Sequence, residues 1–390
     1  MIIAYVANTR YPSNRANALQ KLRMCEALGS LGHEVTLYVR TNFESVDIFR
    51  HYDVRPCFRV EEIPSPFWTQ LTFVPQGINN RLQWAYFALR ARLHSRRAGT
   101  ELVITRDPRF GWFFNNFLLD VHELPQSRRS PWLRCLLKRA CGCIAVTPGL
   151  LRDLANRGVA KERISFLPNG VSIETFASKL SKRAALAQLP VSKEVRDTLE
   201  QGSVLMYTGR FMTNGQEKGI ADILKALALL ADHKHLYFAA VGGTEDEIHY
   251  YQTLAHEQGV EARCIWLGRF TQPELARFQR VADVLLMPFP DQGHYREHMS
   301  PLKTFEYMAS GRPIVASNLP SIQAILRDDE AFWCRHDDPE HLSLVIREVL
   351  ANPAQAVARA SRARAAVEKY SWINRAEQMV THASRCLSLG

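Results

Sequence analysis

The sequence of 390 residues lacks the features that mark several common protein classes. No apolar run reaches the roughly 18 residues that a membrane-spanning helix needs, which argues against an integral membrane protein. The chain enters its first strand without a basic leader, so no signal peptide is expected and the cytoplasm is the expected location. Eight cysteines suggest no disulfide framework, and Cys135, Cys141 and Cys143 have no second ligand cluster at zinc spacing. We therefore expect core thiols and no metal site.

Two glycine-rich nucleotide motifs are also absent. A dinucleotide-binding turn requires Gly-x-Gly-x-x-Gly after a strand, and neither Val6–Ala18 nor Gly209–Gly219 contains it. A Walker-type phosphate loop is missing as well. These absences argue against a nicotinamide-dependent oxidoreductase and against a nucleotide hydrolase. No nucleic-acid-binding module is recognisable, so nucleic acid is not an expected partner.

The composition, with 46% hydrophobic and 23% charged residues, is that of a globular protein. The length exceeds the usual limit of one hydrophobic core, which predicts two domains. Charge is uneven: residues 1–170 hold 24 Lys and Arg against 13 Asp and Glu, a net +11. Residues 171–390 hold 25 against 26, a net −1. The basic part is expected to meet something anionic.

Short apolar segments alternate with amphipathic helices in two successive series. The first series of predicted strands includes Ile2–Val6, Val35–Val39, Leu102–Thr105 and Cys143–Val146. The second includes Val204–Gly209, Leu236–Gly242, Cys264–Leu267, Val284–Met287 and Ile314–Ala316. This alternation predicts an α/β protein with two Rossmann-like domains, each built on a doubly wound parallel sheet.

The most informative segment runs from Ser300 to Ser317. A Ser-Pro pair opens a predicted helix, Gly311 is placed to end it in a left-handed cap, and Pro313 prevents its continuation. A free helix N-terminus beside Lys303 is suited to an anion, with Glu306 one turn further on. From local physics alone, an ordinary α/β crossover explains this segment equally well.

A second basic segment begins where the Val204–Gly209 strand ends. Arg210 follows the strand, and Lys218 lies at the start of the next predicted helix. Two such cations would neutralise a diphosphate leaving group as its charge develops. The alternative is a solvated loop with scattered charge.

The Gly209–Gly219 and Ser300–Ser317 segments together resemble glycosyltransferase family 4, whose members are retaining enzymes of the GT-B architecture. The opening βαβ unit and the Pro168-Asn169-Gly170 turn fit the same family. The resemblance implies two Rossmann-like domains facing across a cleft. It places an N-terminal acceptor domain at residues 1–170 and a donor domain at 171–372, with a terminal helix at 373–390 packing back on the first domain.

The resemblance also implies a donor site. Arg210 and Lys218 correspond to the residues that contact the donor phosphates, and Glu306 to the acid that holds the ribose. The donor-binding set implied in full is Gly209, Arg210, Lys218, Gly268, Arg269, Phe270, His298, Ser300, Pro301, Leu302, Lys303 and Glu306. Within this set the Gly268–Phe270 turn corresponds to the base-binding turn. His298 departs from the family, which has an acid at that position.

Catalytic and acceptor candidates lie mainly in the first domain. His122 is expected at a strand end near the transferred sugar, where many family members have a histidine; a structural role is the alternative. Arg210 and Lys218 complete the predicted catalytic set. The acceptor candidates are Arg10, Arg15, Asn17, Arg106 and Glu123. Solvation of a helix start explains Arg10, Arg15 and Asn17 equally well. No carboxylate pair suited to a nucleophilic mechanism can be placed. The mechanism that the resemblance implies is instead same-face attack, with phosphate stabilisation and positioning supplying most of the acceleration.

The resemblance therefore implies a retaining, hexosyl-type transferase that uses a nucleotide-diphosphate sugar, with a UDP or GDP carrier, and needs no metal or other cofactor. The expected acceptor is a glycan or a lipid-linked molecule in cell-surface polysaccharide or glycolipid biosynthesis. Aromatic residues mixed with arginines on the predicted Trp84–Arg97 and Trp132–Cys141 helices suit an anionic membrane surface, although a core with a charged exterior explains them too. A non-catalytic sugar-nucleotide-binding or glycan-binding relative is the main alternative.

Overall fold

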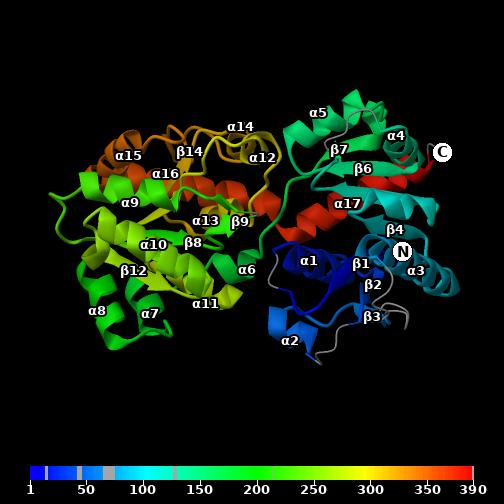
Figure 1. Ribbon diagram of the computed structural model, residues 1–390, viewed down its shortest axis with the longest axis horizontal. Helices are drawn as coiled ribbons and strands as arrows, with labels where there is room; N and C mark the ends of the chain where they lie inside the picture. The colour runs from blue at the N-terminus through cyan, green and yellow to red at the C-terminus, as the bar shows by residue number, and fades with distance from the viewer. Residues whose placement is uncertain (14–15, 42–45, 65–74, 126–129, 214, 389–390) are drawn as a thin grey trace. The chain divides into compact units, whose positions relative to one another are not determined.

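The computed structural model describes residues 1–390 except 14–15, 42–45, 65–74, 126–129, 214 and 389–390. The chain forms two compact units, each with its own parallel sheet (Figure 1). The first unit comprises Met1–Pro168 and Trp372–Gly390, and the second comprises Asn169–Ser371. The predicted α/β fold class, with two doubly wound sheets, is confirmed.

The first unit contains a parallel sheet in the order β3-β2-β1-β4-β5-β6-β7. Its strands are β1 (Ile2–Arg10), β2 (Glu34–Arg40), β3 (Arg59–Ile63), β4 (Leu102–Thr105), β5 (Phe117–Val121), β6 (Gly142–Ala145) and β7 (Ile164–Phe166). Its helices are α1 (Ala16–Ser30), α2 (Ile48–Tyr52), α3 (Gln76–Arg97), α4 (Pro131–Arg139), α5 (Pro148–Asn156) and α17 (Trp372–Ser388), with 3-10 turns at Pro108–Trp112 and Lys161–Arg163. Helix α17, drawn in red, packs on α1 and β6.

The second unit contains a parallel sheet in the order β12-β11-β8-β13-β14-β15. Its strands are β8 (Ser203–Thr208), β11 (Leu236–Val241), β12 (Cys264–Leu267), β13 (Val284–Met287), β14 (Ile314–Ser317) and β15 (Phe332–Cys334), and β9 (Met212–Thr213) and β10 (Gln216–Glu217) form a small antiparallel hairpin. Its larger helices are α8 (Lys193–Gln201), α9 (Ile220–Leu229), α10 (Glu245–Glu257), α11 (Gln272–Val281), α13 (Leu302–Ser310), α15 (Pro339–Ala351) and α16 (Pro353–Ala366). The shorter ones are α6 (Ile173–Phe176), α7 (Lys182–Ala187), α12 (Gly293–Glu297) and α14 (Pro320–Gln323).

The central strands are largely apolar because helices cover both faces of each sheet. All residues of β13 are fully buried, as are Leu205, Met206 and Tyr207 of β8. In each sheet the strand order reverses next to the first strand of the unit: β1 lies between β2 and β4, and β8 lies between β11 and β13. Ligands of open α/β sheets bind beyond the carboxyl ends of the strands at such a reversal, which directs attention to the ends of β8 and β13 and of β1 and β4.

Candidate functional site

The carboxyl end of β8 is built for close approach of backbone segments. Gly209 follows the strand with φ of +108°, and its N–H donates to the carbonyl of Val241 at 2.7 Å. Gly242, at the end of β11, has φ of +119°, and a Cβ there would lie 2.8 Å from the Gly209 carbonyl oxygen. Only glycine satisfies both the backbone angle and the space at Gly242.

Lys218 is fixed between two constrained neighbours at the start of α9. Gly219 is the N-cap residue, with φ of +86°, and a Cβ there would lie 1.8 Å from the carbonyl oxygen of Pro288. The Glu217 carboxylate accepts hydrogen bonds from the N–H groups of Gly219 and Ala221 at 3.2 and 3.3 Å. The first turn of α9 is therefore held against the end of β13, and Lys218 with it.

Helix α13 has the ends that the sequence predicts. Pro301 is its N-cap residue, and Gly311 ends it in the left-handed conformation with φ of +65°. Lys303 and Glu306 both lie on this helix and are both buried. The Lys303 ammonium lies 3.3 Å from the centroid of the Tyr207 ring and 3.6 Å from the point that a Cβ on Gly209 would occupy. It has no hydrogen-bond partner in the part of the chain that the structure describes.

The cations of this region act on one another's protonation. Burial, together with the charge of Arg210, lowers the pKa of Lys218 to about 8. Burial and the charge of Lys218 hold the pKa of Lys303 well below its usual value, although Glu306 opposes this. Arg210 itself is exposed. Three cations therefore lie at the carboxyl end of β8, where a bound anion would relieve their mutual repulsion.

Glu306 occupies a nearly dry position on the same helix. Burial raises the pKa of its carboxyl to about 7, and the nearby Lys303 and Gln279 only partly offset this effect. Gln279 of α11 donates to Glu306 Oε2 at 3.4 Å and to Thr208 Oγ1 at 3.1 Å. The carboxylate is thereby tied to the end of β8, where it has capacity to accept further hydrogen bonds.

Gln279 and Tyr207, which support Glu306 and Lys303, are not among the residues that the sequence predicts for the site. Gln279 is fully buried in α11 next to the apolar Phe278, and a buried amide among apolar residues is a signal that a polar partner is near. Tyr207 gives no such signal, because an aromatic residue in a central strand is ordinary core.

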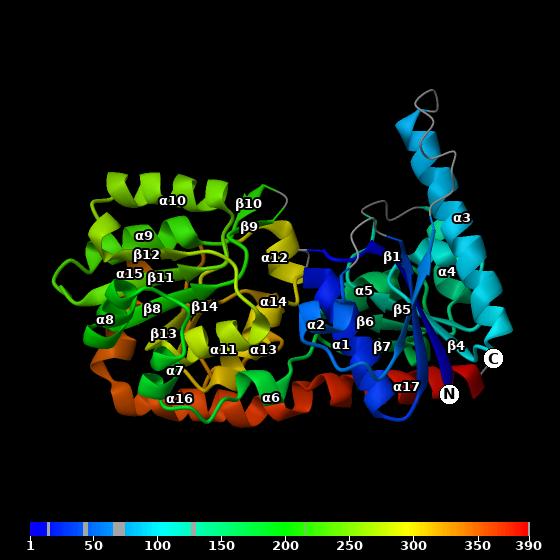
Figure 2. The same cartoon turned by 90° about the horizontal axis from the view of Figure 1, so that it is seen from below.

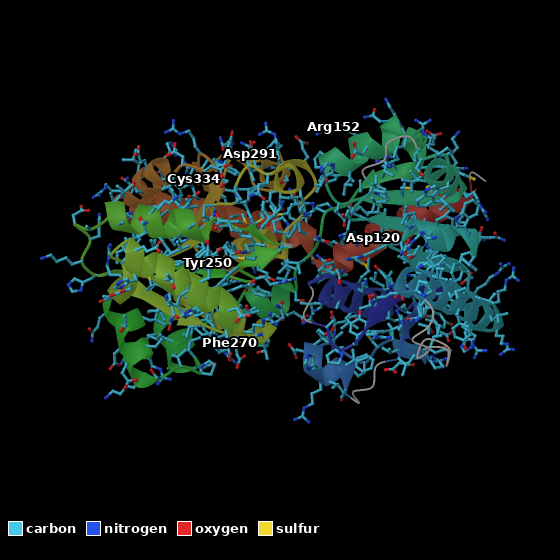
Figure 3. All side chains as sticks on the ribbon, viewed as in Figure 1. Asp120, Arg152, Tyr250, Phe270, Asp291 and Cys334 are labelled. Carbon is cyan, nitrogen blue, oxygen red and sulfur yellow. The ribbon has the colours of Figure 1, made fainter. Side chains whose placement is uncertain are left out.

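The remaining donor-binding candidates lie around this cluster in the second unit. Gly268 and Arg269 are exposed beyond β12. The next residue, Phe270, is labelled in Figure 3, and its ring packs 4.7 Å from that of Phe278, the residue preceding Gln279. Ser300 precedes α13, and Asn169 binds it twice: the Asn169 side chain donates to the Ser300 carbonyl at 2.7 Å and its N–H to Oγ at 3.3 Å. Half-buried His298 ends α12 two residues before Ser300.

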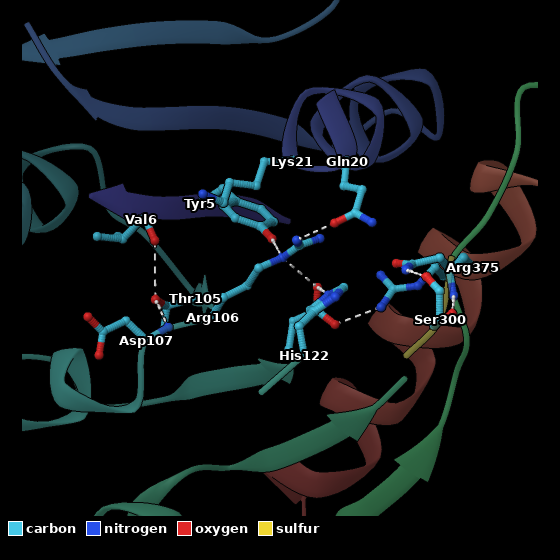
Figure 4. A network of polar contacts seen from close by, with 12 residues as sticks. Tyr5, Val6, Gln20, Lys21, Thr105, Arg106, Asp107, His122, Ser300 and Arg375 are labelled. Atoms are coloured by element: carbon cyan, nitrogen blue, oxygen red, sulfur yellow. Dashed lines mark hydrogen bonds and ion pairs between the residues drawn. The ribbon is translucent and has the colours of Figure 1, made fainter. Parts of the chain in front are cut away.

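In the first unit, one buried carboxylate organises the predicted catalytic histidine. Asp120 of β5 is fully buried, and its two oxygens contact three groups (Figure 4). Arg375 Nη2 donates to Oδ1 at 2.6 Å, Arg106 Nε lies 3.3 Å from Oδ2, and His122 Nε2 lies 3.1 Å from Oδ2. Burial opposes ionisation of Asp120, but Arg375, His122 and Arg106 hold its pKa well below the usual value.

The acceptor candidates separate into Arg106, which is half-buried, and several surface residues. Arg106 donates to Tyr5 at 3.2 Å and to Gln20 at 2.7 Å, and its Nη2 has no hydrogen-bond partner in the described structure. The exposed candidates are Arg10, Asn17 and Glu123. Arg15 lies outside the described residues.

Among the described residues, no helix is both long and apolar enough to cross a bilayer, and no group of three or more His, Cys, Asp or Glu side chains is arranged to hold a metal ion.

Two family models match successive parts of the chain. Residues 22–175 match Glycosyltransferase Family 4, and residues 202–352 match Glycosyl transferases group 1. An uncharacterized glycosyltransferase of Methanocaldococcus jannaschii is 22% identical over 62% of this chain and 59% of its own length. A phosphatidyl-myo-inositol mannosyltransferase of Mycobacterium tuberculosis is 26% identical over 64% of this chain and 60% of its own. The curated relatives are thus matched over only part of their length.

Solved structures match over almost the whole chain. Sucrose-phosphate synthase from Thermosynechococcus elongatus has a TM-score of 0.75 at 21% identity, covering 100% of this chain and 99% of its own. The HepE protein of Anabaena, solved in complex with UDP and glucose, has a TM-score of 0.72 at 13% identity, covering 98% and 99%. At such identities these likenesses establish the fold of the chain.

Proposed function

Because the chain belongs to the GT-B glycosyltransferases of family 4, we propose that it is a retaining enzyme that transfers a hexose from a nucleoside-diphosphate sugar. One observation carries the proposal: the Lys303 ammonium is buried at the carboxyl end of β8 without a hydrogen-bond partner in the described structure, beside Lys218 and Arg210. An anion held there would supply the missing partner.

Different residues of the second unit bind different parts of the donor. Lys303, Lys218 and Arg210 receive the diphosphate and stabilise the charge that grows on its outer oxygens as the sugar leaves. Glu306 accepts hydrogen bonds from the ribose hydroxyls, and the Gly268–Phe270 turn meets the base. Under this proposal no metal ion is needed to neutralise the diphosphate leaving group, because Lys303, Lys218 and Arg210 do so. UDP is the carrier that we favour, since the HepE structure contains UDP and glucose.

In the first unit, His122 meets the transferred sugar, and the acceptor hydroxyl attacks from the face that the nucleotide leaves. The acceptor is a glycan or a lipid-linked molecule of cell-surface polysaccharide or glycolipid synthesis. Support for this class comes from the relatives, among them a putative teichuronic acid biosynthesis glycosyltransferase of Bacillus subtilis and a lipopolysaccharide 1,6-galactosyltransferase of Salmonella typhimurium.

Helix α3 supports a location on the cytoplasmic face of a membrane. Its exposed apolar residues are spaced by four, seven and four positions and therefore form one stripe: Ile78, Leu82, Leu89 and Leu93. Its buried residues, such as Phe87 and Ala91, lie on nearly the opposite side. The helix contains five arginines and no acid, and Figure 2 shows its N-terminal turns extending beyond the strands of the first unit. An apolar stripe bordered by arginines suits an anionic bilayer.

The proposal is tested by incubating the protein with UDP- and GDP-sugars and measuring both nucleotide release and sugar transfer. Glu306→Ala is expected to abolish turnover, and the anomeric configuration of the product distinguishes retention from inversion. Tight binding without turnover on any acceptor would favour a non-catalytic relative instead. Failure of every nucleotide sugar to bind would overturn the proposal.

A further inference from the structure

Arg375 connects the C-terminal helix of the chain to the strand that carries His122. It lies in the first turn of α17, with a side chain only 2% exposed. Its Nη2 donates to Asp120 Oδ1 at 2.6 Å, and its Nε donates to the carbonyl of Pro168 at 2.8 Å. Two directional bonds from one planar guanidinium fix both the position and the rotation of the Asp120 carboxylate.

The second oxygen of Asp120 determines which nitrogen of His122 carries a proton. Asp120 is ionised, so it can only accept hydrogen bonds, and the His122 nitrogen that faces it at 3.1 Å must be the donor. That nitrogen is Nε2. Burial and the charge of Arg106 lower the pKa of His122 to about 4, so the ring is neutral near pH 7. Its Nδ1 is then unprotonated and can accept a hydrogen bond, and it has no hydrogen-bond partner among the residues described.

Among the described residues, Asp120 is the acid whose charge acts on the His122 ring. The charged and titratable groups facing Asp120 and His122 are Arg106 from the end of β4 and Arg375 from α17, and Tyr5 of β1 reaches them through Arg106. His122 is the most accessible member of the network, with 20% of its side chain exposed. The neutral imidazole is therefore the most exposed group of the network, whereas the charged Asp120 and Arg375 are buried. Figure 4 shows the contacts that join them.

We propose that Asp120 and Arg375 are positioning residues, which hold His122 as the Nε2-protonated tautomer so that Nδ1 accepts a hydrogen bond from a hydroxyl of the transferred sugar. The last clause rests on the proposed function, whereas the tautomer does not. Arg375 acts on His122 only through Asp120, from which it is separated by 255 residues of sequence.

The test measures the tautomer and the kinetics separately. Nitrogen-15 NMR of histidine-labelled protein reports which ring nitrogen is protonated, and the His122 signals are assigned as those lost in His122→Gln. Wild type is expected to be Nε2-protonated at pH 7. In Asp120→Asn the amide NH₂ can donate to Nε2, so the proton is expected to move to Nδ1. Turnover should then fall about 100-fold, with the KM for the donor changed less than threefold.

Arg375→Lys tests the helix contact. Lysine keeps the charge but cannot bind Asp120 and Pro168 together in one plane, so we expect mixed tautomers and a smaller fall in turnover. Arg385→Lys is the matched control, because Arg385 also lies on α17 and donates to a backbone carbonyl, that of Glu162, but touches neither Asp120 nor His122. It should leave both readouts unchanged.

The outcomes are distinguishable even where a variant is unstable, because signals of folded protein are read directly. An unchanged Nε2–H tautomer in both Asp120→Asn and Arg375→Lys would overturn the inference and leave only a structural tie. If the tautomer moves but wild type transfers no sugar, the proposed function fails while the positioning role stands.

Discussion

The Lys303 ammonium rests 3.3 Å from the centre of the Tyr207 ring, so a buried cation faces an aromatic surface where a carboxylate would be expected. An aromatic face attracts a cation, but it accepts no strong hydrogen bond from it. The ligand-free protein therefore carries an under-satisfied group at the end of β8. Removal of the Lys303 ammonium should therefore raise the stability of the protein and lower its affinity for the ligand.

Lys303→Met should stabilise the ligand-free protein by about 1–2 kcal/mol, because an unpartnered polar group leaves the core. The same change should weaken UDP binding about 10- to 100-fold through loss of a charged hydrogen bond. Urea unfolding and titration calorimetry measure the two effects. Lys225→Met, at a lysine whose side chain is 54% exposed, serves as control and should alter neither beyond about 0.5 kcal/mol. A destabilised Lys303→Met that still binds UDP normally would assign the lysine a purely structural role.

Lys218 should make UDP affinity depend on alkaline pH. Its pKa of about 8 in the free protein means that the binding-competent ammonium is lost as the pH rises above 8. Affinity should therefore decline between pH 7 and 9.5. Lys218→Arg remains charged throughout this range and should show a shallower decline, with Lys303 responsible for the remainder. Superimposable pH profiles for the two proteins would contradict this role.

Glu306 should lower stability as the pH rises. Its pKa of about 7 exceeds the ordinary value of 4.5, so between these values the folded state holds a proton that the unfolded state has released. The free energy of unfolding should fall by up to about 3 kcal/mol from pH 4.5 to 7 for this group alone. Subtracting the curve of Glu306→Gln isolates the effect from other carboxyl groups. Parallel curves would mean that Glu306 ionises normally.

Gly219 and Gly215 offer a matched pair of substitutions. Both have positive φ, +86° and +75°. An added Cβ meets the Pro288 carbonyl oxygen at 1.8 Å in the first case and, among the described residues, no atom within 4 Å in the second. Gly215→Ala should cost about 1 kcal/mol from backbone strain alone. Gly219→Ala should cost at least about 2 kcal/mol more, and should weaken UDP binding by displacing Lys218. Equal losses of stability in Gly215→Ala and Gly219→Ala would show that the backbone around Pro288 can move away from the added Cβ at little cost in free energy.

The stripe on α3 should bind anionic vesicles. Leu82→Gln combined with Leu89→Gln should reduce partitioning onto phosphatidylglycerol-containing vesicles at least about 10-fold, because two leucine side chains no longer enter the bilayer. Added salt should weaken the binding of wild type. The control replaces Leu229 and Leu344, which are 50% and 61% exposed in the second unit, by Gln. Equal partitioning onto neutral vesicles would exclude the arginines from the interaction.

Features set by local chemistry could be predicted from the sequence. The proline and glycine that begin and end α13 act within one helical turn, and the strands Cys264–Leu267 and Val284–Met287 have the predicted bounds because each is a short apolar run between polar turns. The positions of Lys218 and Lys303 near each other follow from parallel strands whose carboxyl ends share one edge of the sheet.

Contacts between distant segments could not be predicted. Asp120 and Arg375 are 255 residues apart, and nothing in either local sequence identifies the other. Between residues 40 and 100 the sequence predicts only the Trp84–Arg97 helix, whereas the structure has α2, β3 and the longer α3 there. Strand β3 has the sequence Arg-Val-Glu-Glu-Ile and lies at the edge of the sheet, where polar side chains are tolerated. Its two glutamates interrupt the apolar pattern by which a buried strand is predicted.

The return of α17 to the first unit has a consequence for biosynthesis. A ribosome releases residues 1–168 first, yet this segment cannot complete its packing until Trp372–Ser388 has been made, whereas Asn169–Ser371 forms a contiguous unit that is finished earlier. Until the last helix emerges, Asp120 lacks the guanidinium bonded to its Oδ1. The second unit can therefore finish folding before the first, although the first is synthesised earlier. Truncation of the final 19 residues should destabilise the first unit rather than the second.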